Sequence, residues 1–364
     1  MKTAAVIDCF RKNREVCGLF TERVRRETKA ERILWIAGCE FESDGMPAAS
    51  PVGEDAAYLV KAGADAVLIP PKTALLDRAG TEIFAQTALV SRLHFADCIA
   101  VPVSGRHSGE ELKKLAMFLF TEPRDFQRAV RMKMADGASM EEAKRSCAES
   151  FIPGASGVLA DPLDGPAVEL QKCMFQLYCC IRVEWIPMGD CLPMEDSLPD
   201  GTLPDTDGET LFGSKDTDEY FFSLLGECAA DPHFEERVSE TAGGSAAVRD
   251  IAVSRPREFG ALGAEDRSEL RKFILRLLAG IRMADSQMCG LHTYSPYAPL
   301  YAQRDVDGSE WLSELRRESW VPLYTDREMQ EAAERDPGIG IFRTIDASLQ
   351  KIYDGIGRGR KGNP

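Results

Sequence analysis

The sequence predicts an α/β protein: a parallel sheet with helices on both faces, followed by a mostly helical region that contains a small α/β unit. Short apolar runs alternate with longer helical patterns up to about residue 187. The apolar runs lack the polar alternation of half-exposed strands, as expected for strands covered on both sides. The helical patterns between them supply the crossovers that parallel strands require.

The elements of the first region follow from apolar pattern and helix-boundary residues. The predicted strands comprise residues 4–9, 33–37, 66–70, 98–103 and 181–186. The predicted helices comprise residues 14–28, 52–62, 81–95, 109–120, 124–135, 139–149 and 163–180. Pro123 separates two of these helices, because proline is tolerated better at a helix start than in its interior. Ser139 with Glu142 forms a capping-box pattern at the start of another.

An acidic segment divides the chain. Residues 189–217 are rich in Pro, Gly and Asp and show little apolar periodicity, which predicts a disordered loop. Between residues 189 and 220 the sequence holds ten acidic residues against Lys215 alone. We therefore predict an α/β domain, an acidic loop, a helical domain and a basic, disordered tail, at residues 1–188, 189–217, 218–356 and 357–364.

The region after the acidic loop is predicted to be mostly helical. Its first helices comprise residues 218–228, 234–241 and 265–282. In the third of them apolar residues recur at helical spacing from Leu270 to Ile281. Its basic residues, Arg267, Arg271, Lys272 and Arg276, are expected on solvated faces. The small α/β unit at the end of the chain comprises strands 299–303 and 321–324 and helices 309–318, 326–335 and 344–354.

The composition argues against several classes of protein. The eleven cysteines include no CxxC pair, and there are only four histidines, so we expect buried reduced thiols in a cytoplasmic protein without a zinc site or disulfide framework. No apolar run approaches the ~20 residues of a membrane helix, and the N-terminus lacks a signal-peptide pattern. A net charge of −15 disfavours nucleic acid as a partner, because phosphate neutralisation supplies most non-specific affinity.

Four segments carry a resemblance to a known family. Gly45-Met46-Pro47-Ala48 follows Phe41, residues 62–71 begin Ala-Gly-Ala-Asp, residues 161–172 begin Asp-Pro-Leu-Asp, and residues 268–280 form an apolar helix. In order and spacing they resemble the bacterial tRNA(Met) cytidine acetate ligases, a branch of the HxGH nucleotidyltransferases. The resemblance implies a HUP-type, Rossmann-like domain that binds ATP, forms acetyl-adenylate and acetylates a cytidine in tRNA.

The polar residues that the family uses for ATP are altered. After its first strand the family carries Asn-Pro-Phe-His-x-Gly-His; aligned on Asn13, Lys12 replaces the first His, Arg14 the Gly and Glu15 the second His. An asparagine of the family is replaced by Asp164. Lys12, Asn13, Glu15 and Asp164 are thus the degenerate counterparts of cofactor-binding residues. Two further replacements are acidic, Glu40 and Asp44, and would repel a triphosphate if they line the same cleft.

Three interpretations follow from these replacements. The first is a catalytically silent relative that binds a protein or small ligand of unknown identity, with no cofactor, no catalytic residue and no metal ligand. The second is a functional tRNA cytidine acetate ligase using ATP with Mg²⁺, with Arg11, Lys12 and Arg14 as substitute phosphate ligands. The third is an altered nucleotidyltransferase whose acidic residues hold a divalent metal. Transfer RNA is a partner only in the second.

Overall fold

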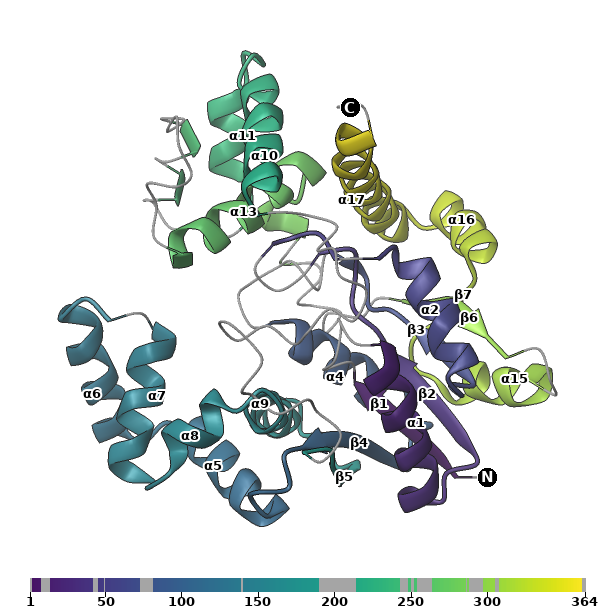
Figure 1. Ribbon diagram of the computed structural model, residues 1–364. Coiled ribbons are helices and arrows are strands. Elements are labelled where there is room, and N and C mark those ends of the chain that lie inside the picture. Colours follow the sequence, from purple (N-terminus) through teal and green to yellow (C-terminus); the bar gives the residue numbers. More distant parts are fainter. Residues whose placement is uncertain are drawn as a thin grey trace.

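The computed structural model describes residues 2–7, 14–41, 45–48, 50–72, 81–138, 140–189, 214–242, 248–249, 252–253, 264–285, 287, 297–304 and 308–361. A seven-stranded sheet in the order β5-β4-β1-β2-β3-β6-β7 forms its centre, and helices cover both faces (Figure 1). The predicted α/β class, with a mostly helical C-terminal region, is confirmed.

Five parallel strands form the larger part of the sheet. They are β1 (Thr3–Ile7), β2 (Arg32–Ile36), β3 (Ala66–Leu68), β4 (Cys98–Val103) and β5 (Arg182–Pro187). Each corresponds to a predicted strand, although the last two residues predicted for the first strand, 8 and 9, lie outside the described part. β1 pairs with both β2 and β4, so it lies at the centre.

Two strands from the end of the chain extend this sheet. β6 (Ala298–Gln303) pairs antiparallel with β3, and β7 (Leu323–Tyr324) pairs parallel with β6. Both strands were predicted, but they join the main sheet rather than forming a separate small unit. The physical reason is that β3 would otherwise present unpaired N–H and C=O groups at an open edge.

The helices of the first region lie close to their predicted positions. They are α1 (Arg14–Thr28), α2 (Val52–Lys61), α4 (Thr81–Leu93), α5 (Gly109–Thr121), α6 (Arg124–Ala135), α7 (Met140–Phe151), α8 (Ala155–Ala160) and α9 (Asp164–Gln176). The short α8 occupies a stretch that we predicted as loop. Residue 139 is outside the described part, so the capping box expected there stays a prediction.

The later helices differ from the prediction in several of their bounds, most of all in the last helix, which begins seven residues earlier and ends seven residues later than predicted. They are α10 (Ser214–Cys228), α11 (Phe234–Glu240), α13 (Ala264–Ala279), α15 (Gly308–Glu318), α16 (Asp326–Arg335) and α17 (Pro337–Lys361). α10 begins inside the predicted acidic loop, of which residues 190–213 lie outside the described part. The prediction of a disordered tail from residue 357 is wrong as far as Lys361, because α17 continues as a helix to that residue. The buried residues of α17 extend to Ile356, one residue before the predicted tail.

Each face of the sheet has its own core. On one face α1 and α2 pack with residues of α10, α13 and α17, while α4, α5, α9 and α15 contribute to the core on the other. Successive residues of β2 alternate between the two cores, as when Ile33 and Trp35 lie in one and Leu34 in the other. Among the described helices, none has the length and apolarity that a membrane crossing requires.

A loop after β2 joins the sheet to the C-terminal helices. Gly45 has a φ of +81°, and a Cβ there would lie 2.8 Å from the Cβ of Arg271 on α13. The Tyr353 hydroxyl of α17 donates a 3.0 Å hydrogen bond to the Ala48 carbonyl, and its ring meets Phe41 edge-on at 6.1 Å. Burial raises the pKa of Tyr353. The loop therefore depends on a glycine for its close approach to α13.

Three of the four basic residues expected on solvated faces of α13 are buried instead, and the side chain of the fourth, Arg267, lies outside the described part. Arg271, Lys272 and Arg276 are all buried, because α13 packs against both α10 and α17. The Arg271 guanidinium holds Asp218 of α10 through two contacts, Nε to Oδ1 at 2.6 Å and Nη2 to Oδ2 at 3.2 Å. These cations stabilise helix packing rather than presenting a basic surface.

Candidate functional site at the carboxyl edge of the sheet

The strand order identifies one edge of the sheet as the place for a ligand. From β1 the chain proceeds outward through β2 and β3, and it then returns to the other side of β1 to form β4 and β5. In open parallel sheets ligands bind outside the carboxyl ends of the strands at this switch point. Here it lies between β1 and β4, and the described part of it is the loop from Ser104 to Ser108 with the start of α9.

Asp164 is the buried centre of that described part. It is the first residue of α9 and is fully buried. Its Oδ1 accepts a 2.8 Å hydrogen bond from the Ser104 backbone N–H, and its Oδ2 accepts a 2.6 Å bond from the Ser104 hydroxyl. The His107 Nδ1 lies 2.8 Å from the same Oδ2. Asp164 thus links the loop after β4 to the N-terminus of α9.

The contacts of Asp164 orient the His107 ring. An ionised carboxylate has no hydrogen to donate, so Asp164 accepts from His107 as it does from Ser104. The Nδ1 of His107 therefore carries the hydrogen, and Nε2 is left for another partner. The His107 side chain is 33% exposed. The imidazole is thereby held at the switch point with one nitrogen available, which suits a hydrogen bond to a ligand or a proton transfer.

Arg106 adds an exposed cation to the same loop. Its side chain is 69% exposed, and its Nη1 lies 3.8 Å from Asp161 Oδ2. Asp161 Oδ1 accepts hydrogen bonds from the backbone N–H groups of Leu163 and Asp164, so this carboxylate caps the start of α9. The described edge therefore offers an anion one guanidinium and one imidazole, whereas its two carboxylates are engaged with the protein.

Close backbone contacts fix the position of this loop. The Ser108 hydroxyl accepts from the Glu111 N–H while the Glu111 carboxylate accepts from the Ser108 N–H, which caps α5. These hydrogen bonds lower the pKa of Glu111. At the end of β5, a Cβ on Gly189 would lie 2.2 Å from the Ser104 carbonyl oxygen, so only glycine fits there.

The structure describes only part of the predicted site. Lys12 and Asn13 lie outside the described residues, and Glu15 is in α1 with its side chain outside the description. Asp164 is described, but it is not a bare carboxylate facing a ligand. The sequence did not single out His107; the signal available was a polar run, Ser104 to Ser108, directly after the buried strand β4.

Glu40 also differs from the expectation, because it belongs to a buried ion-pair cluster beyond the ends of β2 and β3. Its Oε1 lies 2.6 Å from the Lys72 Nζ, and the two side chains are 1% and 4% exposed. The Lys72 N–H donates to Asp346 Oδ1 at 3.0 Å, and the Tyr297 hydroxyl donates to Asp346 Oδ2 at 3.0 Å. With Gln350, 3.4 Å from the Lys72 Nζ, these residues form what we call the Lys72 cluster.

The Lys72 cluster holds two carboxyl groups and one ammonium group. Burial raises the pKa of Asp346 to about 7, against the opposing effects of the Lys72 ammonium and the Tyr297 hydroxyl. One ammonium cannot fully compensate two buried carboxylates, so one of the two retains a proton more readily. The cluster fastens α17 to the sheet, and Glu40 is therefore not a repulsive charge on a phosphate site.

A metal site formed by the predicted acidic residues finds no support in the described part. Glu40 contacts the Lys72 cluster, and Asp164 contacts the loop after β4. Asp44 lies outside the described residues. Within the residues that the structure describes, no group of three or more His, Cys, Asp or Glu side chains could hold a metal ion.

Comparison with known proteins gives a consistent resemblance. No family model matches the chain. A tRNA(Met) cytidine acetate ligase from Caldanaerobacter subterraneus subsp. tengcongensis is 29% identical over 119 residues, which are 32% of this chain and 29% of that protein. The aligned part is therefore less than a third of the relative's length.

Solved structures match over nearly the whole chain. The crystal structure of Thermotoga maritima TmcAL bound with alpha-thio ATP has a TM-score of 0.75 at 16% identity, covering 98% of this chain and 95% of that chain. Its apo form has a TM-score of 0.77 at 15% identity with the same coverage. The resemblance to the tRNA(Met) cytidine acetate ligases, stated from sequence motifs, is thus confirmed as one of fold along the chain and of sequence over about a third of it.

Proposed function

We propose that this protein is a catalytically silent relative of the nucleotidyltransferase-like fold, retained for binding a protein or small ligand. The observation that carries the proposal is the replacement of three motif residues together, by Lys12, Arg14 and Glu15. The imidazoles of an HxGH motif donate hydrogen bonds to phosphates as charge develops there. A lysine supplies a point charge on a flexible stem, which does not reproduce that geometry.

The negative charge of Glu15 is the main electrostatic reason to expect weak ATP binding. A glutamate in place of the second histidine repels a triphosphate, by about 4 kcal/mol for unit charges ~4 Å apart at an effective dielectric of 20. Glu15 holds that position in the alignment. Glu40 does not add to this repulsion, since its carboxylate is buried against the Lys72 ammonium. Asp164 is held by Ser104 and His107 rather than turned toward a ligand.

The second candidate function is an active ATP-dependent tRNA cytidine acetate ligase. It is favoured by the match over 98% of this chain to a TmcAL structure bound with alpha-thio ATP. In that case Arg11, Lys12 and Arg14 would hold the phosphates, and the exposed Arg106 and the partly buried His107 at the neighbouring loop would be further candidates. An altered nucleotidyltransferase is a variant of the same hypothesis.

Calorimetry with ATP and with its Mg²⁺ complex tests the proposal. We expect a Kd for MgATP weaker than about 100 μM, which corresponds to about −5.5 kcal/mol. The variant Lys12→His/Arg14→Gly/Glu15→His restores the motif and should bind ATP at least tenfold more tightly. A parental Kd below about 100 μM, or ATP–pyrophosphate exchange stimulated by acetate, would refute the silent interpretation.

Affinity for tRNA separates the two functions independently. We expect only non-specific binding, with a Kd of roughly 10⁻⁴ to 10⁻⁶ M at physiological salt. The net charge of −15 and the burial of Arg271, Lys272 and Arg276 on α13 both support this expectation. Submicromolar, tRNA-selective gel shifts in about 150 mM salt that survive removal of residues 357–364 would contradict it.

A further inference from the structure

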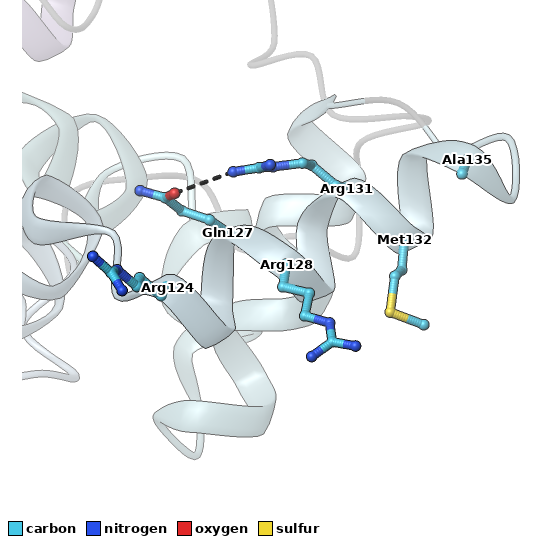
Figure 2. A pocket seen from close by; sticks show the side chains of 6 residues that line it. All are labelled: Arg124, Gln127, Arg128, Arg131, Met132 and Ala135. Carbon is cyan, nitrogen blue, oxygen red and sulfur yellow. Dashed lines mark hydrogen bonds between the residues drawn. The ribbon is translucent and has the colours of Figure 1, made fainter.

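An arginine stripe on α6 is a second surface with the character of a binding site. Arg124, Arg128 and Arg131 recur at intervals of four and three residues and are all exposed. Together with Gln127, Met132 and Ala135 they line an open groove of about 550 Å³ (Figure 2). Figure 2 shows Arg124 and Arg128 extending away from the helix and Arg131 bonded to Gln127, at 3.3 Å.

A second groove adjoins the first on the side of α7. It has a volume of about 260 Å³, and it shares Gln127 and Arg131 with the first groove. The other residues that line it are mostly apolar and are Glu122, Phe126, Val130, Met134, Met140 and Lys144. The two grooves therefore form one surface, which we call the α6 surface, with an apolar floor beside a basic rim.

The charges of the stripe have no counterpart within the described protein. The stretch that contains Arg124, Arg128 and Arg131 is fully described. Among the described residues, no carboxylate oxygen lies within 4.0 Å of a guanidinium nitrogen of these three arginines. Arginines elsewhere are commonly paired, as Arg316 is with Glu328 at 2.7 Å and Arg327 with Glu331 at 3.3 Å. Like charges three and four residues apart on a helix repel each other. A negatively charged partner would remove that repulsion.

The apolar part of the surface favours a protein partner over a nucleic acid. Met132, Met134 and Met140 are 61%, 37% and 48% exposed. Methionine adapts its shape to a partner, and exposed apolar groups rimmed by charge mark interaction sites. Proteins that bind single-stranded nucleic acid also commonly offer accessible aromatic rings on which bases stack. The single aromatic residue lining either groove is Phe126, which is fully buried.

We propose that the α6 surface docks an acidic, amphipathic segment of a partner protein. The partner's apolar side chains enter the grooves beside Met134 and Met140, and its carboxylates face the three arginines. Along the helix axis these arginines are spaced by about 6 Å and about 4.5 Å, the spacing that a helical partner gives to acidic residues four and three positions apart. The surface belongs to α6 and α7, so the proposal holds whether or not the switch-point edge binds ATP.

Fluorescence anisotropy with a labelled helical peptide tests the proposal. The peptide carries Glu at positions four and three apart along one face with Leu beside them, and a matched peptide carries Gln in place of each Glu. We expect a Kd on the order of 10 μM for the acidic peptide, and binding at least tenfold weaker for the Gln peptide. Raising the salt concentration should weaken the first and leave the second nearly unchanged.

Charge-reversal variants locate the binding. In the full chain Arg124→Glu/Arg128→Glu/Arg131→Glu should weaken binding at least tenfold. The control Arg317→Glu/Arg327→Glu/Arg335→Glu makes the same change in net charge at arginines 69%, 89% and 80% exposed, and should change binding less than twofold. Met134→Gln/Met140→Gln should weaken it several-fold, with thermal unfolding confirming that each variant is folded.

Three results would overturn the proposal. They are no binding of the acidic peptide up to about 1 mM, equal losses in the α6 variant and its control, and tighter arginine-dependent binding of a labelled oligouridylate than of the peptide. The first would mean that the surface docks no such segment, the second that only net charge matters, and the third that the surface is for nucleic acid. The Kd for ATP of the α6 variant, measured by calorimetry, should equal that of the parent protein. Failure of the docking proposal and failure of the proposed function can therefore be told apart.

Discussion

Replacing Asp346 with asparagine tests the charge balance of the Lys72 cluster. Asparagine retains an oxygen to accept from the Lys72 N–H, which Asp346 Oδ1 does at 3.0 Å. It removes the titrating carboxyl group from a buried site that also holds Glu40 and Lys72 at 2.6 Å. The change therefore isolates the cost of keeping a second carboxyl group beside a single ammonium.

The pKa of Asp346 gives the magnitude and the sign. Burial raises this pKa to about 7, roughly three units above that of an unfolded chain, which corresponds to about 4 kcal/mol. Between about pH 4 and pH 7 the unfolded chain has lost this proton while the folded protein still holds it. The contribution of Asp346 to the free energy of unfolding therefore falls as the pH rises, by about 1.4 kcal/mol for each unit, and levels off above about pH 7.

Urea unfolding at pH 5, 6, 7 and 8 provides the assay. We expect the free energy of unfolding of the native protein, relative to Asp346→Asn, to decrease by about 3 kcal/mol from pH 5 to pH 8. The control is Asp326→Asn, since the side chain of Asp326 is 92% exposed and should show no such trend. A difference that stays constant over this range would refute the reasoning, because it would mean that Lys72 keeps both carboxylates ionised in the folded state.

Three further predictions concern other parts of the structure. Asp164→Ala leaves the Ser104 and His107 donors without their acceptor and should lower the free energy of unfolding by about 3 kcal/mol in chemical denaturation; a loss under about 0.5 kcal/mol would contradict it. Gly45→Ala places a Cβ 2.8 Å from that of Arg271 and should cost about 2 kcal/mol by the same measurement, whereas Gly53→Ala in α2 meets nothing within 4 Å and should add up to about 1 kcal/mol. Deleting residues 190–213 should shift the melting temperature by a few degrees at most, since their composition leaves little apolar surface to bury, and a collapse in stability would show that they are packed.

Local pattern predicted the elements well where a local cause sets them. β4 was predicted at its observed bounds, because a short apolar run between two helical patterns is typical of a strand that is covered on both faces. The start of α9 was predicted within one residue from the chain around Asp164. The end of α17 was not predicted, because the glycines near the end of this helix are typical of a flexible tail. The row of buried apolar residues that ends at Ile356 is not apparent from the local sequence.

The chemistry of the acidic residues was not predictable in the same way. Asp164 is satisfied by Ser104, 60 residues away, and Lys72 by Asp346, 274 residues away. Pairings of that separation leave no periodic trace in the sequence, so Glu40 and Asp164 read as charges on a cleft. The same holds for Arg271, whose partner Asp218 lies on another helix.

The antiparallel pairing of β6 with β3 has a consequence for synthesis of the chain. Residues 66–68 of β3 pair with residues 300–303, so the growing polypeptide must be extended by more than two hundred residues before this edge finds its neighbour. At a translation rate of roughly 5–20 residues per second, the outer edge of β3 stays unpaired for at least about ten seconds after β3 has been synthesised. A chain truncated before residue 298 would keep that edge open permanently, and self-association rather than loss of secondary structure would be its characteristic failure.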